Sequence, residues 1–237
     1  MVIATVTARL KALRGTKLYD LLAAAPVMVW FAFSVAQMLP ALAQRIALVM
    51  MFVRTDPSVL PATLAFRTVS EICTLVFFAL SIVMYAVRYV PQRSAAGFYP
   101  RFAALAGTFS SLGFLLMPVQ ELSTTLYLVS LLLLIAGIAF AIWALLVLGR
   151  SISLLPEARR LVTAGPYAFV RHPLYLGEMV AVGIALQHLP PWALLLFGLI
   201  WAFQLQRMTY EERVLLQSFP DYRDYVARTA RLVPGVY

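Results

Sequence analysis

The chain has 237 residues, of which 62% are hydrophobic and only 12% are charged. Soluble domains are about half apolar and about one quarter charged, so this composition excludes an ordinary soluble protein and indicates an integral membrane protein. The formal net charge is +9, but no basic stretch is long or soluble enough for nucleic acid, and we expect no nucleic-acid partner.

The N-terminal region begins with a basic leader, residues 1–17, followed by the apolar stretch Leu18–Leu39. At about 1.5 Å per residue this stretch crosses a hydrocarbon core of about 30 Å. A cleaved signal peptide is the competing interpretation, because residues 41–43 read Ala-Leu-Ala, but the apolar run is too long for a signal sequence. We expect a retained membrane helix. The next apolar piece, Ile46–Val53, is too short to span and is expected at the interface or in a loop.

Five further apolar segments follow. The last two are short and are joined at Pro190-Pro191, and paired prolines force a break, which favours a helical hairpin. The second of the five, Phe102–Met117, is rich in small residues and suits close helix packing. In chain order the five are Arg67–Val90, Phe102–Met117, Leu122–Leu148, Tyr175–His188 and Trp192–Gln206. The sequence therefore predicts an all-α, polytopic integral membrane protein with about six hydrophobic segments, including a C-terminal helical hairpin.

The distribution of basic residues tests this topology. With the N-terminus inside, all of the 19 basic residues except Arg45, Arg54 and Arg67 fall on the inner side. Such a bias is what the positive-inside rule requires. We therefore expect both termini in the cytoplasm, in a bacterial inner membrane, and the loop after Leu148 on the same face as the C-terminal tail.

That loop contains a polar and aromatic island, residues 165–177, between two apolar regions. His172 precedes a proline and is pushed toward extended geometry. Pro173 suits the first position of a helix, where its missing N–H costs nothing. The new helix would point its N-terminal end toward Arg171 and His172, a place to hold an anion.

The tail supplies two carboxylates. Glu211 follows Arg207 by one helical turn, the spacing of an ordinary ion pair worth roughly 0.2–0.5 kcal/mol. Glu212 lies on the apolar stripe of the same helix, and a carboxylate beside a membrane needs a partner. Arg171 and His172, on the same side, are candidate partners.

Metal chemistry is not expected. The single cysteine, Cys73, excludes a cysteine-rich metal site. The two histidines, His172 and His188, fall on opposite sides of the predicted topology. These residues alone indicate a pocket at the membrane face with paired cations, carboxylates and aromatic side chains, suited to a zwitterionic or anionic ligand.

The combined pattern of residues resembles a known family over about residues 122–237. The pattern consists of Gly165-Pro166-Tyr167, then Arg171-His172-Pro173-x-Tyr175-x-Gly177, then Glu211-Glu212 with Phe219, Tyr222 and Tyr225. It is similar to the isoprenylcysteine carboxyl methyltransferase and phospholipid methyltransferase superfamily of integral membrane methyltransferases. The resemblance implies a methyltransferase core over 122–237 with a cytosolic cofactor pocket, and it leaves the transmembrane helices of 1–121 without a role.

The resemblance also implies S-adenosylmethionine as cofactor and a lipid or lipidated substrate in the bilayer as methyl acceptor, either a carboxylate or an amine. It implies cofactor-binding roles for Gly165, Tyr167, Arg171, His172, Pro173, Tyr175, Gly177, Glu211 and Glu212. Arg207 matches a family arginine near the methyl acceptor, and with an amine acceptor Glu212 or His172 would take the proton. The alternatives are an NADPH-dependent membrane reductase of the sterol-reductase type and a non-enzymatic membrane scaffold. The oligomeric state is open.

Overall fold

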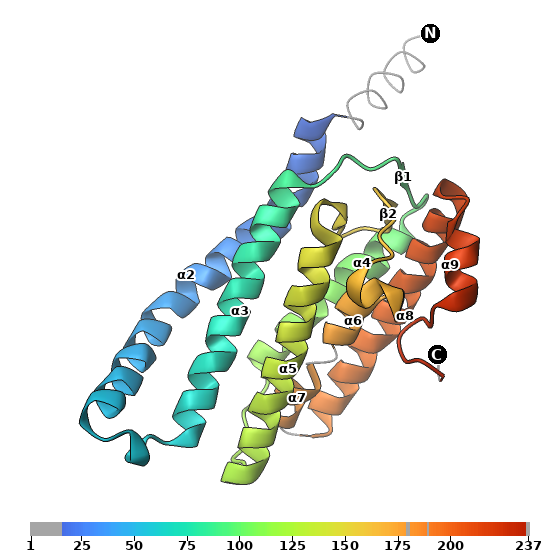
Figure 1. Ribbon diagram of the computed structural model, residues 1–237. Helices are drawn as coiled ribbons and strands as arrows, with labels where there is room; N and C mark the ends of the chain where they lie inside the picture. The colour runs from blue at the N-terminus through green and yellow to red at the C-terminus, as the bar shows by residue number, and fades with distance from the viewer. Residues whose placement is uncertain (1–15, 179–180, 189, 236–237) are drawn as a thin grey trace.

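The computed structural model describes residues 16–178, 181–188 and 190–235, and in this part of the chain the secondary structure is almost entirely helical (Figure 1). The only sheet found there is a ribbon of two short antiparallel strands, β1 (Arg93–Ser94) and β2 (Glu157–Ala158). Three helices are long and apolar enough to cross a membrane. The predicted all-α integral membrane fold is confirmed.

The first membrane helix, α2 (Lys17–Thr55), is longer than expected. It continues through Pro26 and Pro40, so the prediction that the helix ends at Leu39 is wrong. Ile46–Val53 is therefore no separate interfacial piece but the last turns of the same helix. Proline removes one helical hydrogen bond, but an apolar segment in lipid must satisfy its other backbone groups internally, which favours continuing the helix.

The prediction that Phe102–Met117 forms one membrane-spanning helix is wrong. It divides into the short helix α4 (Tyr99–Phe109) and the 3₁₀ helix η2 (Ser110–Leu116). The small residues do allow close packing, because a Cβ placed on Gly113 would lie only 2.9 Å from Cδ2 of Leu196. Serine and glycine are weak helix formers, and their position here coincides with the change of helix type.

The other predicted segments agree more closely with the structure. Helix α3 (Ala62–Val87) is followed, after α4 and η2, by α5 (Thr124–Leu148), and both match predicted spans. The first arm of the hairpin consists of α6 (Pro173–Glu178) and α7 (Ala181–Leu186). The second arm is α8 (Trp192–Ser218), which runs unbroken beyond the apolar segment as expected. The short helix α9 (Tyr222–Arg228) completes the described part.

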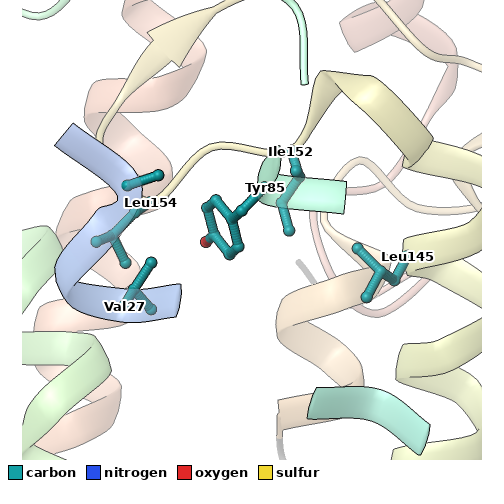
Figure 2. Packing of buried hydrophobic residues seen from close by; sticks show 6 residues of the cluster. Val27, Tyr85, Leu145, Ile152 and Leu154 are labelled. Atoms are coloured by element: carbon teal, nitrogen blue, oxygen red, sulfur yellow. The ribbon is translucent and has the colours of Figure 1, made fainter. Parts of the chain in front are cut away.

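An apolar cluster joins the N-terminal helices to the rest of the protein. Figure 2 shows the Tyr85 ring of α3 between Val27 of α2 on one side and Ile152 on the other, with Leu154 and Leu145 nearby. All five side chains are buried. The loop that follows α5 is thus packed against the first two helices.

Beside this cluster lies a buried ionic network centred on Asp20, whose exposure is 3%. The Asp20 carboxylate accepts hydrogen bonds from Nε of Arg88 at 2.9 Å and from Nη2 of Arg159 at 2.8 Å. Arg159 also reaches Oε2 of Glu157 at 2.6 Å. The network connects α2, the end of α3 and the segment around β2.

The two ends of the helical bundle carry different residues, as the topology predicts. Nζ of Lys17, at the start of α2, donates to the backbone oxygen of Arg88 at 2.5 Å. Nε of Arg150 donates to the backbone oxygen of Val87 at 2.7 Å. The start of α2, the end of α3 and the end of α5 therefore share one end. His188 forms a bridge with Val119, in the loop before α5.

Candidate functional site

The polar island begins with a tight turn. Gly165 has a φ of +58°, and a Cβ placed there would lie 3.0 Å from Cγ2 of Val147, so the position requires glycine. The 3₁₀ helix η4 (Gly165–Ala168) follows and buries Tyr167. His172 lies outside any helix and α6 begins at Pro173, as the proline rule predicts.

The backbone of the island is fixed by the segment after α9. The backbone N–H of Arg171 donates to the oxygen of Ala230 at 2.8 Å, and that of His172 donates to the oxygen of Arg231 at 3.2 Å. Nη1 of Arg171 donates to the backbone oxygen of Thr229 at 2.5 Å. These bonds hold Arg171 and His172 in place before any ligand binds.

Glu212 is bound by three cationic or polar side chains, and we call Glu212, Arg171, His172 and Arg231 the Glu212 cluster. Oε1 of Glu212 accepts from Nε of Arg171 at 2.8 Å and lies 3.0 Å from Nε2 of His172. Nε of Arg231 is 3.3 Å away. Burial alone would raise the pKa of this carboxyl, but the His172 and Arg171 hydrogen bonds and the Arg231 charge outweigh it and lower the pKa from 4.5 to about 2.

Glu211 belongs to a second group, which we call the Arg207 cluster: Arg207, Glu211 and Tyr175. Oε1 of Glu211 accepts from the hydroxyl of Tyr175 at 2.6 Å and from Nε of Arg207 at 3.1 Å, which confirms the predicted ion pair within the helix. Nη1 of Arg207 donates to Oγ1 of Thr108 at 3.2 Å, and Nη2 donates to the backbone oxygen of Ser153 at 3.0 Å. The guanidinium also lies over the Tyr175 ring, 5.0 Å from its centroid.

A third polar contact, the Glu178–Gln204 pair, lies farther along the same two helices. Nε2 of Gln204 donates to Oε2 of Glu178. On α8, Gln204 precedes Glu211 by seven residues, which is roughly 10 Å at 1.5 Å per residue. The polar side chains therefore form a series along the hairpin, from the Glu212 cluster through the Arg207 cluster to the Glu178–Gln204 pair.

A pocket of about 110 Å³ connects these groups. Six of the residues that the sequence marks as site candidates line it: Tyr167, Arg171, His172, Tyr175, Arg207 and Glu211. Four others lie outside its lining: Gly165, Pro173, Gly177 and Glu212.

Gly177 shows why a site candidate can lie outside the pocket. A Cβ placed there would be 2.7 Å from Cβ and 2.9 Å from Cα of Ala141. This glycine therefore brings α6 against α5. Glu212 lies behind the pocket, where it orients two of the side chains that line it, Arg171 and His172.

Other pocket residues were missed by sequence reasoning. Arg159, Arg160 and Glu178 line the pocket without having been marked as candidates, and Tyr222 and Tyr225, which belong to the sequence pattern but had no assigned site role, line it as well. The adjacent arginines just before the island were a detectable signal, and so was a carboxylate within an apolar arm, since ionisable residues in such segments are rare and mark function. Tyr225 donates its hydroxyl to the backbone oxygen of Tyr167 at 2.6 Å, and burial raises its pKa to about 12.

No group of histidine, cysteine and acidic residues that could hold a metal ion occurs in residues 16–178, 181–188 and 190–235. Nδ1 of His188 lies 2.8 Å from the backbone oxygen of Ile184, and its ring packs on Phe114. The chemistry of the pocket is therefore that of guanidinium, carboxylate, imidazole and phenol groups.

The C-terminal part of the chain is similar in sequence to known proteins. Residues 125–221 match the family model described as phospholipid methyltransferase. The chain is 36% identical over 100 residues to protein-S-isoprenylcysteine O-methyltransferase B of Arabidopsis thaliana, covering 39% of this chain and 50% of that protein. It is 38% identical over 97 residues to the protein-S-isoprenylcysteine O-methyltransferase of Schizosaccharomyces pombe, covering 36% and 41%.

A third relative carries a different description. The nickel-cobalt-cadmium resistance protein of Alcaligenes xylosoxydans xylosoxydans is 33% identical over 81 residues, covering 33% of this chain and 38% of that protein. The matched region thus spans about half the length of the plant methyltransferase and less of the other two. The family model and the methyltransferase relatives support the resemblance seen in the sequence: residues 125–221 are similar to the isoprenylcysteine carboxyl methyltransferase and phospholipid methyltransferase superfamily.

Proposed function

We propose that the protein is an S-adenosylmethionine-dependent methyltransferase that methylates a lipid or isoprenylated acceptor at the cytosolic face of the membrane. The observation that carries the proposal is the convergence of Arg171, His172, Tyr175 and Glu211 on one pocket at the end of the membrane helices. Glu211 is about 40 residues away in the chain from the other three groups. Together the four supply cationic and anionic partners for the carboxylate and the ammonium of the amino-acid part of S-adenosylmethionine.

The donor set of the pocket fits the proposed cofactor. Its carboxylate suits the guanidinium groups of Arg171 and Arg160, its ammonium and ribose hydroxyls suit Glu211, and its adenine suits the aromatic and apolar lining near Tyr167. The volume of about 110 Å³ is below the roughly 300–1,000 Å³ of small-molecule sites. Binding therefore requires lining side chains to move outward.

When bound, S-adenosylmethionine supplies a methyl group on a sulfonium, which is transferred by in-line displacement. The protein contributes alignment and exclusion of water, since correct placement of two reactants can account for roughly 7–11 kcal/mol of a barrier. In this proposal Arg171 and Glu211 hold the cofactor, while Glu212 positions Arg171 and His172. Arg207 keeps Glu211 and Tyr175 in place on the acceptor side of the cofactor.

The proposed membrane face follows from charge. All described basic groups of the pocket lie at the end of the bundle that also carries Lys17, Arg88 and Arg150. The positive-inside rule assigns such an end to the cytoplasm. A lipid acceptor would then enter from the bilayer and meet a soluble cofactor bound from the cytosol.

Isothermal titration calorimetry with S-adenosylhomocysteine on detergent-purified protein tests the proposal. We expect binding by the wild type, binding weakened at least tenfold in His172→Ala and Glu211→Gln, and unchanged binding in His188→Ala, which alters the other histidine outside the pocket. Absence of binding to the wild type, or equal binding by all four proteins, would refute the proposal. Methyl-label transfer to a membrane lipid extract then identifies the acceptor.

The two rival functions predict different ligands. A membrane reductase would be stabilised by NADPH and not by S-adenosylhomocysteine in a thermal-shift assay. A membrane scaffold would respond to neither nucleotide. The proposed methyltransferase is stabilised by S-adenosylhomocysteine alone.

A further inference from the structure

Glu178 lines the pocket but has no role in the proposed cofactor site. Glu178 is the last residue of α6 and lines the pocket together with Arg207 and Tyr175. In the sequence Glu178 is followed by the apolar residues of the hairpin arm. In the proposed topology this arm enters the membrane, which places Glu178 at the bilayer side of the pocket. A lipid acceptor arriving from the bilayer would meet this carboxylate before the Glu212 cluster.

Arg207 does not offer an acceptor carboxylate a free guanidinium. Each of its three nitrogen atoms donates to a protein oxygen: Nε to Glu211, Nη1 to Thr108 and Nη2 to Ser153. Its positive charge is matched by Glu211 at 3.1 Å, and its face is covered by the Tyr175 ring. The positive charge at this level of the pocket is therefore already compensated.

Glu178 differs from Arg207 both in its hydrogen bonds and in its charge compensation. Within the described part of the chain it forms no ion pair, and only its Oε2 has a hydrogen-bond partner, the amide Nε2 of Gln204. Its Oε1 is left as an acceptor beside the pocket. With Arg207 and Glu211 compensating each other, Glu178 is a carboxyl group without an ion-pair partner in the described residues, and in its ionised form it repels a carboxylate and attracts an ammonium group.

We infer that Glu178 binds the headgroup of the methyl acceptor and selects a lipid with a primary or secondary amine over one with a carboxylate. The inference rests on the proposed methyltransferase function. Glu178 removes a proton from the acceptor ammonium, and the freed nitrogen lone pair attacks the methyl carbon of the sulfonium. The new C–N bond forms as the C–S bond breaks, and the bonding pair stays on sulfur, which leaves as a neutral thioether.

A pair of matched amphiphiles tests the inference by binding alone. Dodecylamine and dodecanoate have the same chain and differ in headgroup, and calorimetric titration of each into the protein in phosphatidylcholine nanodiscs measures selectivity. We expect the wild type to bind dodecylamine at least tenfold more tightly than dodecanoate. Glu178→Gln should reduce that ratio at least fivefold, whereas Glu121→Gln, the same change in an exposed loop, should leave it unaltered.

S-adenosylhomocysteine affinity separates the possible failures. We expect Glu178→Gln to bind it within twofold of the wild type, which also establishes that the variant is folded. A loss of more than fivefold would mean that Glu178 holds the cofactor and would overturn the inference while supporting the proposed function. An unchanged amphiphile ratio in Glu178→Gln would likewise overturn it. No binding of S-adenosylhomocysteine by the wild type would overturn the proposed function and this inference together.

Discussion

Oε1 of Glu212 and Nε2 of His172 are 3.0 Å apart, although the two residues are separated by 40 positions in the chain. The same oxygen accepts from Arg171, so a single carboxylate orients both the guanidinium and the imidazole of the island. The neighbouring Glu211 faces the pocket instead. Two adjacent acids on one helix are therefore expected to behave differently, one as a structural anchor and the other as part of the ligand site.

We predict that Glu212→Gln lowers the free energy of unfolding by about 1.5–3 kcal/mol, the range for hydrogen bonds to charged groups. The neutral amide removes the negative charge that faces the guanidinium groups of Arg171 and Arg231. Denaturant unfolding in detergent measures the loss. Glu121→Gln, in an exposed loop, should change stability by less than about 0.5 kcal/mol, and an equal effect of the two substitutions would contradict the anchoring role.

The pH dependence of stability should report the same carboxylate. Its pKa in the folded protein is lowered from 4.5 to about 2, so the folded state binds fewer protons than the unfolded state between these values. The stabilisation is fully present above pH 4.5 and is lost as the pH falls toward 2. Between pH 4.5 and pH 2 the melting temperature should fall less steeply with decreasing pH in Glu212→Gln than in the wild type. Identical slopes would show that another group controls acid stability.

Features controlled by local rules could be predicted from the sequence. The helix start at Pro173 follows from proline geometry, and the Arg207–Glu211 contact follows from helix spacing. The span α5 follows from length and hydropathy. Each depends on residues within one or two turns of one another.

Features that depend on tertiary contacts could not be predicted. The continuation of α2 beyond Leu39 is determined by the helix's surroundings, which composition does not report. The backbone hydrogen bond from Arg171 of the island to Ala230 joins two distant segments, and no sequence motif indicates that they meet. The division into residues 1–121 and 122–237 stays a prediction, but Asp20 in the first part contacts Arg159 in the second, so the two parts share a buried ion pair.

The close contact of α6 with α5 gives a prediction with an internal control. Gly177→Ala would place a methyl group 2.7 Å from Cβ of Ala141, and overpacking of this kind costs about 1–3 kcal/mol. Gly198→Ala makes the same change on α8, where the added Cβ meets nothing within 4 Å. It should be neutral or stabilising because alanine favours helix. Comparison of the two melting temperatures tests the contact, and equal shifts would contradict it.

The buried Asp20 network gives the N-terminal helices a testable role. Asp20→Asn would leave the guanidinium groups of Arg88 and Arg159 without their shared counterion, and breaking a buried ion pair costs about 3–5 kcal/mol. Because Arg159 lines the pocket, its displacement should also weaken S-adenosylhomocysteine binding in the proposed methyltransferase. Asp224→Asn, on the exposed face of α9, is the matched control and should alter neither property. Full retention of stability in Asp20→Asn would mean that α2 is anchored by apolar packing around Tyr85 alone.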